Sequence, residues 1–314
     1  MPVTNHRVLI IGARRSHQGL GEFIANFFVE AGASICAVVG TSQSTVDEAL
    51  TNLKTRWGIS SVGYTDLPTA IQEQSPSIVA ICSPHVFHQE HLQITLDHGL
   101  HCLCEKPMVW QDGEKCDLNE VARIANGFHQ QKKLLRLVTQ WPLTLDEYFT
   151  LFPEVKPQPI HRFKMLLGPA ATGRAALADS LPHVLSMIHA LTGIGSVQNV
   201  RTLSKEPERT EFSFDYQHDH GILVVDVSLV LTPNPPRPAG YAINGFFAQR
   251  TIKLPEYQFL FSNDEGRQIP VKDPLPKLIK NFLQAVEDGQ ATQEDLIVAS
   301  MRDLKVITEN INLE

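Results

Sequence analysis

In the first 140 residues, short apolar runs alternate with segments that have helical spacing. Short, mostly apolar runs of this kind are typical of strands that are buried on both faces of a parallel sheet. The six runs are Val8–Ile11, Ile35–Val39, Val62–Tyr64, Ile78–Cys82, His101–Cys104 and Leu134–Val138. Because strand–helix–strand connections are right-handed, this alternation predicts an α/β domain with a doubly wound parallel sheet.

Beyond residue 140 the pattern changes, because prolines break up the chain and the strand-like runs become longer. These runs are Arg162–Leu167, Val197–Leu203, Glu211–Tyr216 and Ile222–Leu231, and two helical segments follow near Leu275–Glu287 and Gln293–Ile311. A hairpin turn at Asp219-His220-Gly221 joins the last two runs. We therefore predict an N-terminal domain over residues 1–140 and a C-terminal α+β domain over 141–314, with a mostly antiparallel open sheet.

Composition narrows the class of protein. The net charge of −7 and a pI near 6.0 disfavour a generally basic nucleic-acid binder. No apolar run reaches the roughly 18 residues of a membrane span, and the polar N-terminus is unlike a signal peptide. We interpret the five cysteines as reduced thiols. These features predict a cytoplasmic protein with no nucleic-acid or membrane partner.

A glycine-rich loop follows the first predicted strand. It contains Gly12, Gly19 and Gly21, with Arg14 and Arg15 between them. Backbone N–H groups at such a turn, where a helix begins, can bind a pyrophosphate. The spacing is not a regular G-x-G-x-x-G, so the alternative is that these glycines only allow a tight strand-to-helix turn.

The end of the second strand bears on the choice between NAD and NADP. Thr41 and Ser42 stand where an NAD site carries an acid, and the next acid is Asp47. Hydroxyl groups can bind a 2′-phosphate, and Arg14 or Arg15 can supply the balancing charge. We therefore expect NADP as the cofactor, with NAD as the alternative. Both arginines can also be solvated loop charges.

Two further loops follow later strands and should lie at the same sheet edge as the glycine-rich loop. One holds Ser83 and Pro84 with His88 shortly after, and the other is Glu105-Lys106-Pro107. With these motifs, residues 8–107 resemble the N-terminal domain of the Gfo/Idh/MocA oxidoreductases. The resemblance implies a Rossmann-type domain in which Lys106 is catalytic. The cofactor-binding residues are then expected to be Gly12, Arg14, Arg15, Gly19, Gly21, Thr41, Ser42, Ser83, Pro84, His88 and Glu105.

A second motif of this family is an aspartate followed four residues later by a histidine, and Asp179 and His183 fit it. On a helix, both side chains share one face. We expect His183 to be the acid/base, held neutral at the start of a helix, Lys106 to hydrogen-bond the reacting atom, and Asp179 to orient this pair. The alternative is that Asp179 or Ser180 is only a helix N-cap, with Pro182 in the first turn. His85, His88 and His91 recur every three residues without a suitable further ligand, so we expect no metal.

The resemblance implies an NADP(H)-dependent oxidoreductase that moves a hydride between nicotinamide and a C–OH/C=O or C–N/C=N carbon of a small metabolite. The alternative is a non-catalytic dinucleotide-binding regulator of the same fold. By resemblance alone, we also expect a homo-oligomer that associates through the C-terminal sheet. The substrate stays open among sugars, polyols, ketones and imines.

Overall fold

The computed structural model describes residues 6–14, 19–111, 116–253 and 258–312. The chain forms two compact units, one comprising Met1–Val138 with Leu275–Val298 and the other Thr139–Pro274 with Ala299–Glu314. Helix α8 (Pro274–Glu287) thus lies almost wholly in the first unit, although the sequence analysis grouped it with the second domain. The reason is packing, because the Phe282 ring meets Phe28 edge to face, with 6.2 Å between ring centroids.

The first unit contains a six-stranded sheet in which every pair of neighbours is parallel. Its strands, in the spatial order β3-β2-β1-β4-β5-β6, are β3 (Val62–Tyr64), β2 (Ser34–Val39), β1 (Arg7–Ile11), β4 (Ile78–Ile81), β5 (His101–Cys104) and β6 (Leu135–Leu137). The order reverses between β1 and β4, and ligands of open α/β sheets bind at such a point, outside the carboxyl ends of the strands.

Helices separate the strands along the chain. They are α1 (Gly21–Glu30), α2 (Gln43–Trp57), α3 (Leu67–Gln74), α4 (His88–Asp97), which the short 3₁₀ segment η1 (His85–Phe87) precedes, and α5 (Leu118–Gln130). Helix α1 packs against α2, and α4 packs against both α3 and α5. These two groups are expected for helices on the two faces of a doubly wound sheet. The predicted fold class is therefore confirmed for this unit.

The second unit contains an eight-stranded sheet. In the order β14-β13-β12-β11-β7-β10-β9-β8, the strands are β14 (Gln268–Val271), β13 (Gln258–Ser262), β12 (Phe246–Lys253), β11 (Ala239–Ile243), β7 (Arg162–Leu167), β10 (Gly221–Val230), β9 (Arg209–His218) and β8 (Ser196–Glu206). Only β7 and β10 pair in parallel, so the prediction of a mostly antiparallel sheet is confirmed.

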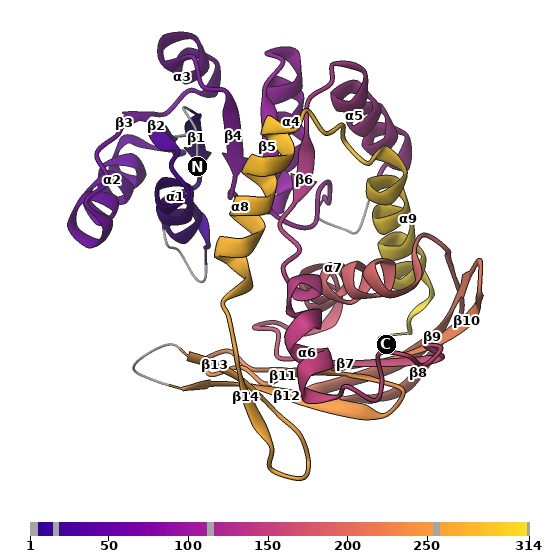
Figure 1. Ribbon diagram of the computed structural model, residues 1–314. Helices are drawn as coiled ribbons and strands as arrows, with labels where there is room; N and C mark the ends of the chain where they lie inside the picture. The colour runs from indigo at the N-terminus through magenta and orange to yellow at the C-terminus, as the bar shows by residue number, and fades with distance from the viewer. Residues whose placement is uncertain (1–5, 15–18, 112–115, 254–257, 313–314) are drawn as a thin grey trace. The chain divides into compact units, whose positions relative to one another are not determined.

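The helices of this unit lie over one face of its sheet, as Figure 1 shows. They are the 3₁₀ segment η2 (Trp141–Thr144), α6 (Leu145–Leu151), α7 (Gly173–Thr192) and the C-terminal part of α9 (Glu294–Asn310). In the described part of the unit, no helix covers the opposite face. That open face carries ion pairs, among them Arg162–Asp226 at 2.8 Å and Arg201–Asp215 at 2.6 Å.

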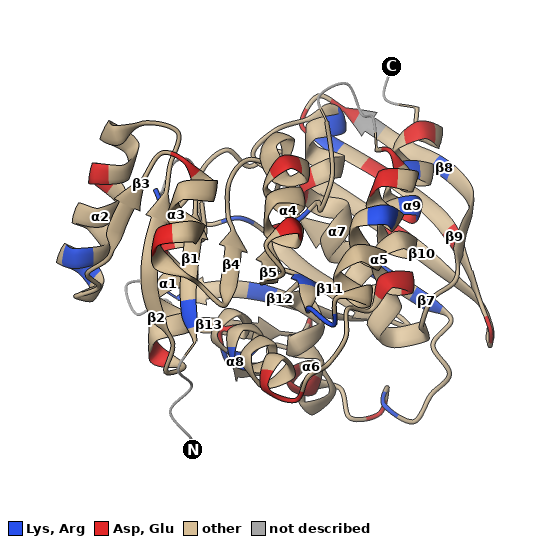
Figure 2. Ribbon diagram, turned by 90° about the horizontal axis from the view of Figure 1, so that it is seen from above, with Lys and Arg blue, Asp and Glu red and all other residues tan. Residues whose placement is uncertain are grey.

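Acidic and basic residues are interspersed over the elements of the chain, as Figure 2 shows. Among the described residues, no helix has the length and apolar character needed to cross a membrane. The described residues also contain no group of three or more His, Cys, Asp or Glu side chains that could hold a metal ion.

Candidate functional site

The glycine-rich loop turns tightly at the carboxyl end of β1. Gly12 has φ +81°, and its N–H donates to the carbonyl of Val39 at 3.0 Å. A Cβ on Gly12 would lie 2.8 Å from the backbone N of Ser83, and one on Gly21 would lie 2.4 Å from the carbonyl oxygen of Gly12. Both positions therefore require glycine, because the loop passes directly over the end of β4 and folds back onto itself.

Helix α1 begins at Gly21 without a side-chain cap, since Leu20 occupies its N-cap position. The first N–H groups of the helix therefore keep their capacity to bind oxygen atoms of a ligand. Gly12, Gly19 and Gly21 lie in or at the ends of this loop, whereas Arg15 lies outside the described residues. A dinucleotide pyrophosphate fits the described ends of this loop, because Gly12 and Gly21 have no side chain to cover the backbone there.

The loop after β2 uses one of its predicted ligand groups locally. Ser42 is the N-cap of α2, and its Oγ accepts from the N–H of Thr45 at 3.3 Å. Thr41 is exposed. Arg14 Nε forms an ion pair with Glu48 Oε2 at 2.9 Å, with side-chain exposures of 44% and 49%. The guanidinium that we expected to face a 2′-phosphate therefore already has a carboxylate partner, and no sequence motif indicates this ion pair.

His88 connects the loops that follow β4 and β5. Its Nε2 lies 2.8 Å from the carbonyl oxygen of Ser83, and its Nδ1 lies 2.9 Å from that of Pro107. The ring is only 1% exposed, and burial lowers the pKa of His88 to about 4. The neutral ring has a single N–H, so it donates to one of these two carbonyls. Both nitrogens thus face the backbone, and neither is presented to a ligand.

Lys106 lies in a loop whose backbone is fixed on both sides. The N–H of Glu105 donates to the carbonyl of Ile81 at 2.8 Å, and the residues from Met108 to Trp110 are at most 4% exposed. Lys106 itself is partly exposed. Ser83, on the neighbouring loop, has its Oγ 3.0 Å from His91 Nδ1, and Pro84 is exposed. The structure therefore brings Gly12, Ser83 and the Lys106 loop together at one edge of the sheet, as the topology predicted.

In the second unit, Asp179 and His183 lie in the middle of α7, which begins at Gly173. The alternative that Asp179 is an N-cap is therefore wrong, and so is the expectation that His183 lies in a first helical turn. Asp179 is exposed and His183 is partly exposed. Pro182 has no N–H to donate to the carbonyl of Ala178. The helix therefore lacks one backbone hydrogen bond in the turn that contains Asp179.

An aromatic residue connects His183 with a cation on the sheet. The Trp141 ring lies edge-on to His183 with a centroid distance of 6.5 Å, and the Arg250 guanidinium lies 4.8 Å from the Trp141 ring centroid. Trp141 is 4% exposed and also contacts Tyr241 at 6.0 Å. Sequence reasoning did not find Trp141 or Arg250, because no motif links residues so far apart along the chain.

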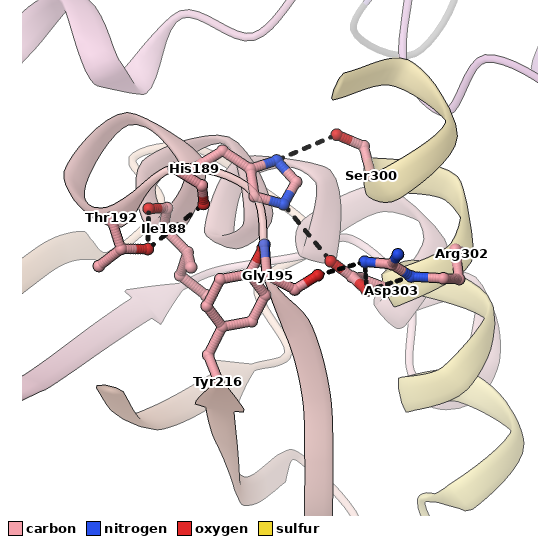
Figure 3. Close-up of polar contacts among 9 residues, drawn as sticks. Ile188, His189, Thr192, Gly195, Tyr216, Ser300, Arg302 and Asp303 are labelled. Carbon is pink, nitrogen blue, oxygen red and sulfur yellow. Dashed lines mark hydrogen bonds and ion pairs between the residues drawn. The ribbon is translucent and has the colours of Figure 1, made fainter. Parts of the chain in front are cut away.

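A cluster of polar side chains, formed by His189, Ser300, Arg302 and Asp303, joins α7 to α9 (Figure 3). His189 Nδ1 lies 3.2 Å from Ser300 Oγ, and its Nε2 lies 3.4 Å from Asp303 Oδ2. Arg302 donates to the other Asp303 oxygen at 2.8 Å and to the carbonyl of Gly195. The residue types are those of a hydrolase triad. Ser300, however, lies inside α9, where backbone N–H groups are bonded within the helix and cannot form an oxyanion hole. We assign this cluster a structural role.

Comparisons with known proteins agree with this arrangement. Residues 6–136 match the family model GFO_IDH_MocA, described as an oxidoreductase family with an NAD-binding Rossmann fold. A D-glucoside 3-dehydrogenase of Escherichia coli (strain K12) is 25% identical over 171 residues, which are 51% of this chain. The match spans about half of that protein's length, 48%.

Two solved structures share the fold over nearly the whole chain. GenD2 from gentamicin A biosynthesis, in complex with NAD, has a TM-score of 0.71 at 15% identity and covers 99% of this chain and 96% of its own. Myo-inositol 2-dehydrogenase from Lactobacillus plantarum has a TM-score of 0.69 at 16% identity, with coverages of 98% and 97%. At these identities the likeness shows a common fold.

Proposed function

Given that residues 6–136 of this chain carry the NAD-binding Rossmann domain of the Gfo/Idh/MocA oxidoreductases, we propose that the protein is an NADP(H)-dependent oxidoreductase acting on a small metabolite. The observation that carries the proposal is the tight glycine-rich turn after β1. In this turn Gly12 packs against the backbone of Ser83, at the sheet edge where Lys106 also lies. The dehydrogenase activity named for the 25% identical relative supports the same class of reaction.

The dinucleotide cofactor fits the glycine-rich turn between β1 and α1, and when bound it would supply or accept the hydride. The backbone N–H groups of Gly19, Gly21 and the start of α1 would hold the pyrophosphate, and Gly12, whose own N–H is bonded to Val39, would leave room for it. Thr41, Ser42 and Arg14 would contact the 2′-phosphate. Arg14 must leave Glu48 to do so, which is feasible because an exposed ion pair is worth only about 0–1 kcal/mol. Ser83, Pro84 and Glu105 line the nicotinamide end.

Three residues carry out the proposed reaction on the substrate. Lys106 donates a hydrogen bond to the reacting oxygen or nitrogen, and His183 moves the proton at that atom. Asp179, one turn before His183 on the same helix face, orients the imidazole. His88 acts as a positioning residue, because its buried ring packs between the carbonyls of Ser83 and Pro107 and donates a hydrogen bond to one of them.

The proposal also covers assembly and location. The open face of the eight-stranded sheet is the surface through which we expect a homo-oligomer to form. We place the protein in the cytoplasm, in line with thiols such as Cys36, Cys82, Cys102 and Cys104, which form no disulfide.

The test is a spectrophotometric assay of nicotinamide oxidation and reduction against a panel of sugars, polyols, ketones and imines. The proposal predicts turnover with at least one compound and with NADP(H) in preference to NAD(H). Binding of NADPH without turnover of any compound in either direction would favour the non-catalytic regulator instead.

A further inference from the structure

Arg250 is a charged residue on the buried face of a sheet. Along β12 it pairs with Ala239 of β11 and Phe261 of β13, which are 2% and 0% exposed. The next inward position, Ala248, is 0% exposed and pairs with Tyr241, also 0% exposed. Every neighbouring position on this face is thus apolar or aromatic, and a guanidinium there loses much of its hydration.

The arginines on the opposite face of the same sheet are different. Arg162, Arg201 and Arg209 each have a carboxylate oxygen within 2.8 Å. Within the described residues, Arg250 forms no such ion pair, and its buried Nε has no hydrogen-bond partner. The contrast shows that this sheet ordinarily supplies its arginines with an anion.

What Arg250 does contact is aromatic. Its guanidinium lies 4.8 Å from the Trp141 ring centroid and 5.6 Å from that of Phe259. Burial lowers the pKa of Arg250 to about 10, while the charge of Asp273 acts in the opposite direction. The side chain therefore stays cationic at neutral pH, and cation–π contacts position its planar fork without satisfying its N–H donors.

Trp141 places this cation beside the proposed acid/base. The two ring contacts of Trp141, to Arg250 and to His183, lie within one unit of the structure. Arg250 and His183 are both partly exposed, whereas Trp141 between them is buried. Both side chains are therefore accessible to solvent and contact the same buried ring.

We propose that Arg250 binds an anionic group of the substrate, a carboxylate or a phosphate, while His183 acts on a carbon elsewhere in the same molecule. A guanidinium fork matches the paired oxygens of either group. The inference rests on the proposed function for the role of His183, but the anion site itself does not depend on hydride transfer. It narrows the substrate class to acidic metabolites, such as sugar acids or sugar phosphates.

The test is isothermal titration of the full chain, in the presence of NADP⁺, with D-glucuronate, D-glucose 6-phosphate and uncharged D-glucose. At least one anionic probe should bind at least about tenfold more tightly than D-glucose. The probe with the advantage tells whether the site prefers a carboxylate or a phosphate. If neither anion binds more tightly than D-glucose, the inference is wrong.

Variants separate this site from general charge effects. Arg250→Met should abolish the anionic preference, and Arg250→Lys, which keeps the charge but not the fork, should retain part of it. Arg237→Met is the matched control, because Arg237 also has a buried Nε without a hydrogen-bond partner but donates to the carbonyl of Pro233 instead. An anionic preference that survives undiminished in folded Arg250→Met, as judged by thermal melts, would overturn the assignment.

His183→Ala keeps the two proposals distinguishable. It should lose turnover and retain the anionic preference. Should no compound be turned over by the wild type while Arg250-dependent anion binding persists, the oxidoreductase proposal fails and the anion site stands.

Discussion

Arg14 and Glu48 illustrate how a single contact changes the interpretation of a sequence motif. The sequence shows a basic loop and no acid directly after β2, which favours NADP. The structure adds a carboxylate 2.9 Å from Arg14, contributed by the second turn of α2. Glu48 therefore competes with a 2′-phosphate for the same guanidinium, and the cofactor preference depends on which of them Arg14 binds.

NADPH should bind at least about tenfold more tightly than NADH, a difference of roughly 1.4 kcal/mol. Glu48→Gln should strengthen NADPH binding by up to about fivefold, because it removes an exposed competitor worth about 0–1 kcal/mol, and should leave NADH binding nearly unchanged. Asp47→Asn, one position earlier on the same helix, is the control. Isothermal titration measures all three proteins, and equal affinity of the wild type for both cofactors would contradict the roles of Arg14, Thr41 and Ser42.

Lys106→Met and His183→Ala should each lower kcat by about 10²–10⁴-fold, the usual scale for a positioned acid or base. NADPH affinity should change little, because both groups act mainly in the transition state. Steady-state kinetics and cofactor titration on the same preparations measure the two effects. Turnover like that of the wild type in both variants would rule out this mechanism.

Asp179→Asn should be milder in kcat and should leave the melting temperature unchanged. The reason is that Asp179 is exposed in the middle of α7 and does not cap the helix. A large loss of thermal stability with full turnover would show instead that the residue supports the fold.

At the scale of elements, the periodicity of the first half was sufficient to predict its strands and the position of their loops at one sheet edge. Continuous apolar runs such as Ile78–Ile81 leave few alternatives. The second half was harder, and strands β11 to β14 were not predicted. Strands β11, β13 and β14 are only four or five residues long. In addition, β11 (Ala239–Ile243) is buried throughout, so its sequence lacks the alternation that identifies a half-buried strand.

Some residues of the candidate site could likewise be predicted from the sequence, and others could not. The sequence placed Gly12, Ser83 and Lys106 at one edge because parallel topology requires it. The roles of His88 and Arg250 could not be predicted, because they depend on contacts between residues distant in sequence or on burial. His88 was assigned to the cofactor, whereas its nitrogens face two backbone carbonyls.

His88 should make the protein acid-sensitive. Its pKa in the folded state is about 4, below the unfolded value near 6.5, so the unfolded chain binds more protons between these pH values. Stability should therefore fall as the pH decreases through this window, by about 3 kcal/mol in total from this residue. Urea unfolding of the wild type and His88→Gln at several pH values measures the effect.

The variant should lose less stability than the wild type between pH 6.5 and pH 4. His220→Gln, at an exposed turn between β9 and β10, should behave like the wild type. Parallel pH profiles for the wild type and His88→Gln would show that His88 does not contribute in this way.

The cluster in Figure 3 stabilises the contact between α7 and α9. Asp303→Asn removes the carboxylate that His189 and Arg302 share, and the loss of such buried contacts costs about 1–3 kcal/mol. We expect the melting temperature to drop and the catalytic constants of the folded protein to persist. Ser300→Ala should have the smaller effect, and a loss of turnover without a loss of stability would contradict a purely structural role.

At the scale of the whole molecule, the open face of the eight-stranded sheet bears on assembly. The ion pairs Arg162–Asp226, Arg201–Asp215 and Arg209–Glu211 all lie on it. An interface formed through such a polar face depends more on charge than one formed through an apolar face, and salt screens exposed charges.

Light scattering coupled to size-exclusion chromatography should therefore show an oligomer at low salt that dissociates partly at about 1 M salt, where the Debye length is only about 3 Å. Arg162→Glu, which places like charges opposite Asp226, should shift the equilibrium toward the monomer. A wild-type protein that is monomeric at low salt would contradict association through this sheet.

The central claim is that the edge formed by Gly12, Ser83 and Lys106 is the dinucleotide site, and a crystal structure with bound NADPH tests it most directly. The account predicts the pyrophosphate on the backbone N–H groups at the start of α1 and the nicotinamide ring beside Lys106. A pyrophosphate bound away from the Gly12–Gly21 loop, or a nicotinamide beyond the reach of Lys106, would contradict it.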